Sequence, residues 1–205
     1  MAGIIPILAT AFCLGLVTTA AIAQSDTVGS VSQLKGTASG EKGGTIETLD
    51  LGASVFMNEV LATGTASRLE VAFLDETQLT LGERSKVRVD RFVYGGGHTQ
   101  MLKVAAVGAL RFISVRNKPA GTQVIVTTPV AEIGIRGTDF WTGPIDGQFG
   151  VLVLEGAVTV SNPAGAVELD QAGEGTNIAG PGSAPGPVTQ WPQQKVDRAL
   201  AAVAF

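Results

Sequence analysis

The feature that most constrains the fold of this chain is an alternation of apolar and other residues with a period of two. In "SRLEVAFLD", Leu69, Val71 and Phe73 are apolar, and the residues between them are charged or small. Similar short runs recur in "TQLTL", "KVRVDRFVY", "TQVIVTT" and "FGVLVL". Because successive side chains of a strand point to opposite faces, this pattern predicts short strands with one buried face.

Turn signals separate these runs, and glycine marks several strand starts. Segments such as "LGERS", "YGGGH" and "SNPAG" are rich in turn residues, and no helical periodicity interrupts the chain from Val28 to Leu169. The stretches "VGSVSQL", "VGALRFI" and "EGAVTV" share a Gly that suits a tight corner. We expect an all-β domain of short stacked strands, either a roll or solenoid-like stack or a sandwich.

The length and composition predict one domain with tails. Of the 205 residues, 45% are hydrophobic and 16% are charged, which is enough apolar material for a packed core. The predicted organisation is a signal peptide at 1–23, a β domain at 24–175, a Gly/Pro-rich linker at 176–190 and a tail at 191–205. In the tail, a stripe of apolar residues predicts a short helix that docks on the β domain or on a partner: Val196, Ala199, Leu200 and Val203.

The N-terminus has the pattern of an export signal. An apolar run from Ile4 to Ala20 precedes Ala21-Ile22-Ala23, which fits the small-x-small rule for cleavage after Ala23. We therefore expect a periplasmic or secreted protein. Cys13 is the one cysteine and lies within this signal, so the mature chain would have neither a disulfide nor a cysteine zinc site.

Charge and composition argue against several function classes. The net charge is −4 and no cluster of Lys and Arg is present, which argues against a nucleic-acid partner. Phosphate-loop and dinucleotide motifs are absent from the sequence. We therefore expect neither a cofactor nor a metal.

The acidic residues and the one histidine give little support to an enzyme. Asp75 and Glu76 lie at a predicted turn, where acids bond to nearby backbone groups, and the other acidic candidates are Glu83 and Asp90. His98, the one histidine, lies in the glycine-rich turn "YGGGHT". These positions favour a protein without a catalytic site.

The stretch "TPVAEIGIRGTDFW" holds the most unusual combination of residues. Pro129 marks a break between two strands, and after it the alternation puts Ile133 and Ile135 on one face with Gly134 and Arg136 on the other. The pair Gly137-Thr138 predicts a turn or bulge, with Thr138 satisfying backbone groups. We interpret the stretch as a buried structural turn.

Single residues of this stretch leave two alternatives. Arg136 is either a half-buried structural lock, bonded to carbonyls or to a carboxylate such as Glu132 or Asp139, or part of a binding surface. As a lock, Arg136→Ala would lower the thermal midpoint clearly. Trp141 and Trp191 are candidate partner contacts, or Trp141 covers the end of the core and Trp191 anchors the tail helix.

The motif resembles a known family signature. "TPVAEIGIRGTDF" is similar to the TP-x-A-x-x-G-[IV]-RGT-x-F signature of the FecR family. The segments "VGSVSQLKGTA", "LGASVFMNEVLATGTASRLEVAFLDETQLTLGERSKVRVDRFVY" and "GALRFIS" precede it in the family order, so the resemblance covers roughly Val28 to Gly175. The matching motif residues, structural or binding in role, are Thr128, Pro129, Gly134, Arg136, Gly137, Thr138 and Phe140.

The resemblance implies an all-β sensor domain and a role in signalling. Founding members of the family couple an outer-membrane receptor to an extracytoplasmic-function sigma factor through a cytoplasmic segment and a transmembrane helix. Here a predicted signal peptide leads directly into the β domain. We therefore expect a free-standing exported sensor or adaptor that acts through a membrane or envelope protein, with weak self-association through β edges. A structural or adhesive module of the envelope is the alternative.

Overall fold

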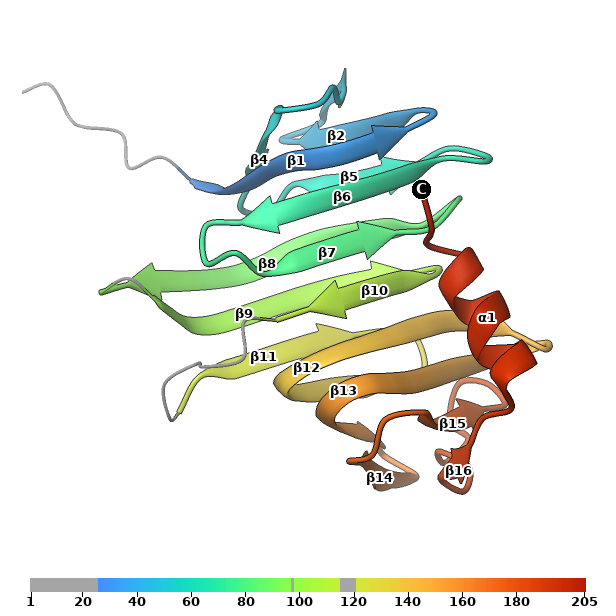
Figure 1. The fold of residues 1–205 in the computed structure, drawn as a ribbon. Helices are drawn as coiled ribbons and strands as arrows, with labels where there is room; N and C mark the ends of the chain where they lie inside the picture. Colours follow the sequence, from blue (N-terminus) through green and yellow to red (C-terminus); the bar gives the residue numbers. More distant parts are fainter. Residues whose placement is uncertain (1–25, 97, 115–120) are drawn as a thin grey trace, which may run out of the picture.

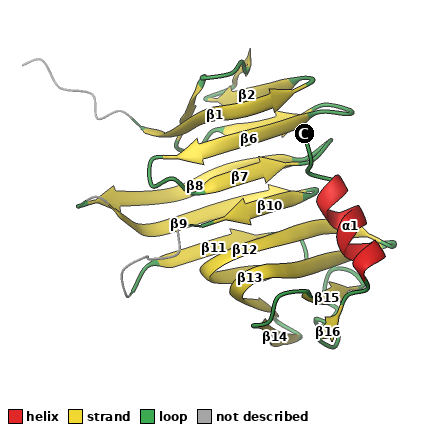
Figure 2. Cartoon of the chain, in the orientation of Figure 1, coloured by secondary structure: helices red, strands yellow, loops and turns green. Residues whose placement is uncertain are grey.

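One sheet that curls back on itself forms the body of the molecule, as the ribbon views show (Figures 1 and 2). The computed structural model describes residues 26–96, 98–114 and 121–205. Within these residues the predicted all-β domain with one short C-terminal helix is confirmed. The predicted signal peptide, with Cys13, lies outside the described residues.

The sheet has a front and a back layer joined by one long strand (Figure 1). The front layer contains, in spatial order, β4 (Ser54–Phe56), β1 (Thr27–Lys35), β6 (Arg68–Phe73), β7 (Gln78–Leu81) and β10 (Leu110–Ile113). The back layer contains β3 (Thr45–Thr48), β2 (Ala38–Lys42), β5 (Val60–Thr63), β8 (Lys86–Gly95), β9 (His98–Val107) and β11 (Gln123–Thr127). Strand β12 (Glu132–Ile145) pairs with β11 in its first half and with β10 in its second half, so it crosses between the layers.

The last strands close one end of the stack. Strand β13 (Gln148–Asn162) follows β12 and pairs with β14 (Gly165–Leu169) and β15 (Glu174–Ile178), and β16 (Thr189–Gln190) pairs with β15. The predicted linker was to begin at residue 176, which lies inside β15. That boundary is too early, because β15 bonds to β13 as far as Ile178. The sequence of β15, "EGTNI", contains too few alternating apolar residues to be recognised as a strand.

Four corners between the layers stack in a column on one side of the molecule. Gly36 and Gly108 turn the corners from β1 to β2 and from β9 to β10 with φ values of 75° and 99°, a region that other residues rarely adopt. Neighbouring corners bond to each other: the Gly64 N–H donates to the Thr37 carbonyl (3.0 Å), and the Gly82 N–H donates to the Ala109 carbonyl (2.8 Å). Of the three glycines that the sequence predicts at corners, Gly108 turns one, whereas Gly29 lies within β1 and Gly156 within β13.

Buried hydroxyl groups hold this column together. Thr63 Oγ1 donates to the carbonyl of Gly82 (2.6 Å) and accepts from the Ser85 N–H (2.9 Å). Ser85 Oγ donates to the carbonyl of Ala109 (3.1 Å), one corner further along. Corner backbone groups that lie outside the strand ladders are satisfied in this way, as buried polar groups require.

The core lies between the two layers and runs from the first described strand to β15. Alternate residues of each strand point into it, which confirms the buried faces that the period of two predicts. Fully buried large side chains include Phe112 and Phe140, whose ring centroids are 5.8 Å apart.

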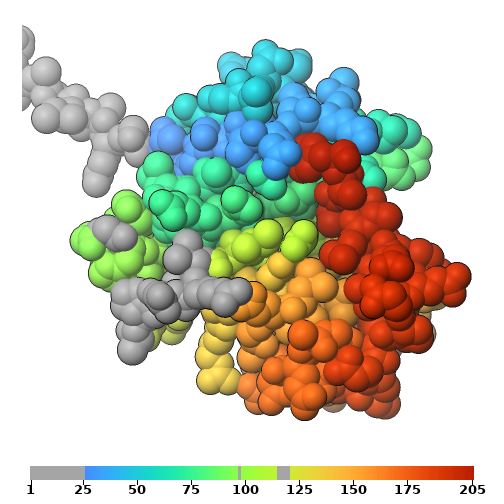
Figure 3. All heavy atoms as spheres, in the orientation of Figure 1, coloured from blue at the N-terminus to red at the C-terminus, as the bar shows by residue number. Residues whose placement is uncertain are grey.

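The helix α1 (Gln193–Ala201) packs on the outer side of the front layer and forms a second, smaller core with it. Ala199 and Val203 are buried there and Val196 is partly buried, which confirms the predicted apolar stripe at these three positions. Leu200, the fourth predicted residue, is partly buried but not part of this core. Figure 3 shows the C-terminal segment lying along one side of the molecule, from the region of β13 toward the strands of the first half.

Candidate functional site: the motif of β11 and β12

The motif begins with a tight turn between β11 and β12. The Thr128 hydroxyl accepts a hydrogen bond from the Ala131 N–H (3.0 Å) and donates to the Ala131 carbonyl (2.8 Å), while the Thr128 N–H donates to the same carbonyl (2.9 Å). Pro129 is exposed at the tip, where its missing N–H costs nothing. Thr128 and Pro129 therefore shape the turn that sets the register of the two strands.

The first half of β12 shows the alternation that the sequence predicts. Ala131, Ile133 and Ile135 are buried in the core. Glu132, Gly134 and Arg136 point outward from the back layer. We call this outer side of the back layer, over β8, β9, β11, β14, residues 132–136 of β12 and residues 157–162 of β13, the back face.

Gly137 and Gly156 form the bend at which β12 and β13 cross between layers. Gly137 has a φ of 54° and lies in a register shift between Arg136 and Asp139, so the predicted bulge is present. Gly156, with a φ of 80°, lies opposite on β13, and a Cβ on it would come 2.4 Å from the Gly137 carbonyl oxygen. Gly137 is therefore needed for its backbone conformation, and Gly156 for both its conformation and its close approach to Gly137.

Thr138 completes the bend through its backbone. Its N–H donates to Ser114 Oγ (3.0 Å), and its carbonyl accepts from the Ser114 N–H (2.9 Å). The predicted role of the Thr138 side chain is wrong, because its buried hydroxyl has no hydrogen-bond partner among the described residues. The methyl-bearing side chain instead packs against the position of Gly156.

Arg136 is not a half-buried lock. Its side chain is 78% exposed and bonds to Glu168 of β14 (2.7 Å), rather than to Glu132 or Asp139. Since an ion pair exposed to this degree contributes little to stability, the predicted loss of thermal midpoint on Arg136→Ala no longer follows. The binding-surface alternative is the one that agrees with its exposure.

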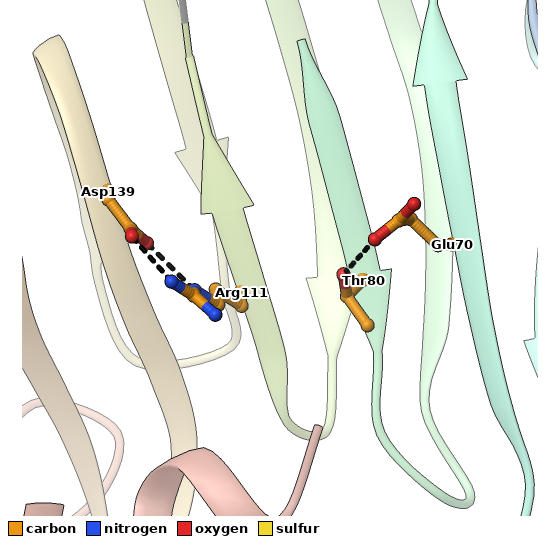
Figure 4. A network of polar contacts seen from close by, with 4 residues as sticks. All are labelled: Glu70, Thr80, Arg111 and Asp139. Atoms are coloured by element: carbon orange, nitrogen blue, oxygen red, sulfur yellow. Dashed lines mark hydrogen bonds and ion pairs between the residues drawn. The ribbon is translucent and has the colours of Figure 1, made fainter. Parts of the chain in front are cut away.

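A partly buried structural ion pair, one of the two alternatives for Arg136, is formed instead by Arg111 and Asp139 (Figure 4). Arg111 on β10 donates from Nε and Nη2 to the two oxygens of Asp139 on β12 (2.9 and 2.6 Å), and the Asp139 side chain is 18% exposed. The hydrogen bonds to Asp139 raise the pKa of Arg111, although burial opposes this. A charged residue inside the otherwise alternating "GALRFIS" was the signal for this pair.

A second polar cluster lies on the same outer side of the front layer (Figure 4). The Glu70 carboxylate accepts hydrogen bonds from Ser32 Oγ (2.7 Å), Gln33 Nε2 (3.0 Å) and Thr80 Oγ1 (3.3 Å). These bonds tie β1, β6 and β7 together, so the cluster has a structural role.

The two tryptophans pack on each other and not on the surface. Trp141 is fully buried and Trp191 is 6% exposed, with ring centroids 6.3 Å apart. Phe140 points into the main core while Trp141 lies beneath α1. The partner-contact interpretation of Trp141 and Trp191 is therefore wrong, and the alternative, in which Trp191 anchors the tail helix, describes the structure.

The acidic candidates for catalysis have local roles. Asp75 accepts from the Thr77 N–H (3.1 Å) and from Thr99 Oγ1 (2.6 Å), and Glu83 accepts from the Ala66 N–H (2.9 Å). Asp90 pairs with Arg88 on the back face, and Glu76 lies in the turn before β7. His98 begins β9 and contacts the Gly96 carbonyl (3.2 Å). The arrangement brings none of these groups into a catalytic cluster.

Across residues 26–96, 98–114 and 121–205, no group of three or more His, Cys, Asp or Glu side chains is placed to hold a metal ion. Among the same residues, no helix has the length and apolar character needed to cross a membrane.

A shallow hollow of about 340 Å³ opens on the back face beside the motif turn. Its outer lining includes Val60, Ala105, Val107 and Pro129, and the charged side chains of Lys86 and Arg88 also line it. Val107 is 56% exposed, so apolar surface remains accessible here. The motif thus contributes its outward residues to an open face and its inward residues to the core.

Comparisons with known proteins agree with this architecture. No curated protein matches the sequence. Two crystal structures of a candidate anti-sigma factor from Parabacteroides distasonis, at 1.65 and 2.50 Å resolution, are similar in fold, with a TM-score of 0.57 and 21% identity in each case. The similarity covers 69% of this chain and 64% and 63% of the other chains, less than two thirds of their length.

The family comparison matches the segment that contains the motif. Residues 59–159 match the family model described as FecR protein, from the end of the β4–β5 connection to the second half of β13. The bend at Gly137 and the turn at Thr128 both lie inside this range. Residues 59–159 are therefore a domain of the FecR family.

Proposed function

We propose that this protein is a non-enzymatic, exported adaptor or sensor that acts in envelope signalling by binding a membrane partner. The observation that carries the proposal is the FecR domain at residues 59–159, whose motif residues build a structural turn and bend. Family membership and the fold shared with a candidate anti-sigma factor support a regulatory role. Regulation in trans requires a surface for a partner, and the back face is open for one.

The absence of a catalytic cluster among the described residues agrees with this proposal but does not carry it. The motif itself is the stronger argument. Its inward residues fill the core and its glycines permit the bend, so the outward residues are the part that remains for recognition.

An in-cell crosslinking experiment tests the proposal. A photo-reactive amino acid at Val107, on the back face, would be compared with one at Leu51, which is 70% exposed in the turn between β3 and β4. Expression with the native N-terminus, followed by fractionation and mass spectrometry, identifies both the compartment and the captured protein. We expect Val107 to capture one integral-membrane signalling protein from the envelope fraction and Leu51 to capture far less.

Two results would contradict the proposal. Retention of the protein in the cytoplasm would exclude export. Capture of only cell-wall or surface components from both positions would favour the structural or adhesive module instead.

A further inference from the structure

Gly134 is the motif residue that the fold itself does not explain. It lies in the interior of β12, between Ile133 and Ile135, and its side-chain position faces outward. Its φ lies outside the left-handed region, and a Cβ at this position would meet one atom within 4 Å, the carbonyl oxygen of Thr159 at 4.0 Å. Any β-forming residue therefore fits, and glycine in a strand interior weakens the strand.

Glycines in the interior of the other described strands have a visible reason, whereas Gly95 and Gly165 lie at strand ends. A Cβ on Gly29 would come 2.3 Å from the Ala72 carbonyl oxygen, and one on Gly175 would come 2.3 Å from the Trp191 ring. Gly40 and Gly150 are similarly closed by Glu59 and by Trp191. An added Cβ at Gly134 would meet open space instead. We therefore infer that the glycine serves a contact with another molecule.

The surroundings of Gly134 form a bare strip on the back face. Ile125 of β11 and Thr159 of β13 are its cross-strand neighbours. On one side Lys103 pairs with Glu132 (3.8 Å), and on the other Arg136 pairs with Glu168 (2.7 Å). The two ion pairs frame the partly exposed backbone at Gly134, onto which a flat group can be laid.

The charge of the back face is opposite in sign to that of the whole chain. Its cations are Lys86, Arg88, Arg91, Lys103 and Arg136, and its carboxylates are Asp90, Glu132 and Glu168. Five cations and three carboxylates give a net charge of +2, against −4 for the chain. Among the described residues, Lys86 and Arg91 have no ion-pair partner, so an acidic partner would find cations free to bind it.

We propose that the back face around Gly134 is the docking surface for an acidic protein segment that lays an aromatic side chain on the bare backbone of Gly134. Aromatic rings pack well over a glycine between strands, because the missing side chain exposes a flat surface. Lys103 and Arg136, at either side, are placed to pair with carboxylates that flank the ring in the partner segment. This deepens the function proposed above, since it assigns the partner-binding face and the chemistry of the partner.

The first test uses short peptides as probes of that chemistry. The ¹⁵N-labelled protein would be titrated with Glu-Asp-Trp-Asp-Glu and, as controls, with Glu-Asp-Ala-Asp-Glu and Lys-Lys-Trp-Lys-Lys. We expect the acidic tryptophan peptide to shift the amide signals of Ile125, Gly134 and Thr159. The alanine peptide lacks the ring and the lysine peptide has the wrong charge, so both should bind at least about tenfold more weakly.

The second test uses Gly134→Val with Gly180→Val as its matched control. Gly180 lies outside the back face, has no atom within 4 Å of an added Cβ and has no left-handed φ. Gly134→Val should keep or raise the thermal midpoint, because valine favours strands, and should abolish the shifts caused by the peptide. Gly180→Val should leave both unchanged. Reversing the unpaired charges with Lys86→Glu and Arg91→Glu should weaken binding without lowering the midpoint.

Several outcomes would overturn the proposal. They are the absence of back-face shifts with the acidic tryptophan peptide, equal binding by Gly134→Val, and a midpoint that falls clearly in that variant, since the last would give the glycine a structural role. Failure of the proposed function is separable from these results. Peptide binding at Gly134 together with cytoplasmic retention would remove export while leaving the docking surface in place.

Discussion

At the scale of single residues, burial separates two arginines that look alike in the sequence. Arg136 is 78% exposed beside Glu168, whereas Arg111 holds Asp139, which is 18% exposed, through two parallel hydrogen bonds. A carboxylate in a partly buried site that loses its cationic partner still bears the cost of its desolvation. In an exposed ion pair, by contrast, water solvates the carboxylate that remains, so little stability is lost.

The first prediction compares the two arginines. Arg111→Met should lower the free energy of unfolding by about 1–3 kcal/mol, because Asp139 is left without its partner. Arg136→Ala should lower it by less than about 1 kcal/mol. Urea unfolding of both variants measures the difference, and equal losses would contradict the assignment of the lock to Arg111.

The second prediction concerns the bend glycine on β13. Gly156→Ala should destabilise the protein by at least about 1–2 kcal/mol, since the left-handed backbone alone costs this amount. The contact of the new Cβ with the Gly137 carbonyl oxygen, at 2.4 Å, adds to it. Gly147, which also has a positive φ (73°) but open space around its Cβ position, is the matched control: Gly147→Ala should show the backbone cost alone. If the two variants were equally stable, close approach would not matter at the bend.

At the scale of elements, α1 is held by its docking site and not by its own sequence. A helix of nine residues is marginal in water, and here it is fixed by Trp191, Ala199 and Val203 against Trp141. The glycines at 150 and 175 leave the space that the Trp191 ring occupies. The helix should therefore depend on Trp191 more than the sheet does.

The third prediction follows from this dependence. In Trp191→Ala, the amides of α1 should exchange with solvent nearly as fast as in an unfolded chain, while those of β6 and β7 remain protected. Phe205→Ala, at a side chain that is 43% exposed, is the control and should leave α1 protected. Hydrogen exchange with mass spectrometry makes the comparison, and a protected α1 in Trp191→Ala would show that the helix has another anchor.

The fourth prediction is a pH effect at the same contact. Burial lowers the pKa of Lys195, whose Nζ lies 3.9 Å from the centre of the Trp191 ring, below its ordinary value of 10.5. Between the lowered pKa and pH 10.5, the unfolded chain binds more protons than the folded one, so the free energy of unfolding gains a contribution that rises with pH. Denaturant unfolding from pH 8 to 10.5 should show this contribution in the wild type and not in Lys195→Met. Parallel pH profiles for the two proteins would be the contrary result.

The sequence predicts a feature where the pattern lies within one strand or helix, and does not predict it where the feature depends on contacts between distant segments. The alternation from Ile133 to Arg136, the turn at Pro129 and the apolar stripe of α1 are local, so the sequence predicts them. The partner of Arg136 depends on β14, two strands away in the sheet, and the burial of Trp191 depends on a tail that folds back over β15. Neither the period of two nor the turn residues contain information on contacts between residues so far apart in the sequence.

At the scale of the whole molecule, the sequence predicts stacked strands but not the way in which the stack closes. Of the repeated glycines that predict corners, Gly108 lies in the column of corners, whereas Gly29 lies within β1 and Gly156 at the bend of β13. The sequence predicts the bulge at Gly137 but not the crossing of β12 between layers, because the crossing depends on the different partners of its two halves, β11 and β10. The opposition of Gly137 and Gly156 becomes visible only once β12 and β13 are paired.

The single core leads to a final prediction about cooperativity. Buried residues from Val28 to Ile178 form one continuous cluster, although the family match covers only residues 59–159, and β1 to β4 lie before it. If this shared core governs stability, the whole chain should unfold in one transition. Far-ultraviolet circular dichroism would follow all strands, and tryptophan fluorescence would follow only the end near Trp141 and Trp191.

Truncations of core side chains at opposite ends of the stack test this prediction. Val55→Ala acts in β4, at one end of the sheet path, and Leu169→Ala acts in β14, which branches from β13 at the opposite end of the stack (Figure 1). Both side chains are fully buried. In each variant, the midpoint measured by circular dichroism and the midpoint measured by fluorescence should fall by the same amount. The reason is that loss of packing at either end of a single core destabilises the whole domain. A Val55→Ala transition seen by circular dichroism before fluorescence changes would mean that β1 to β4 unfold separately, as an addition to the FecR domain and not as part of its core.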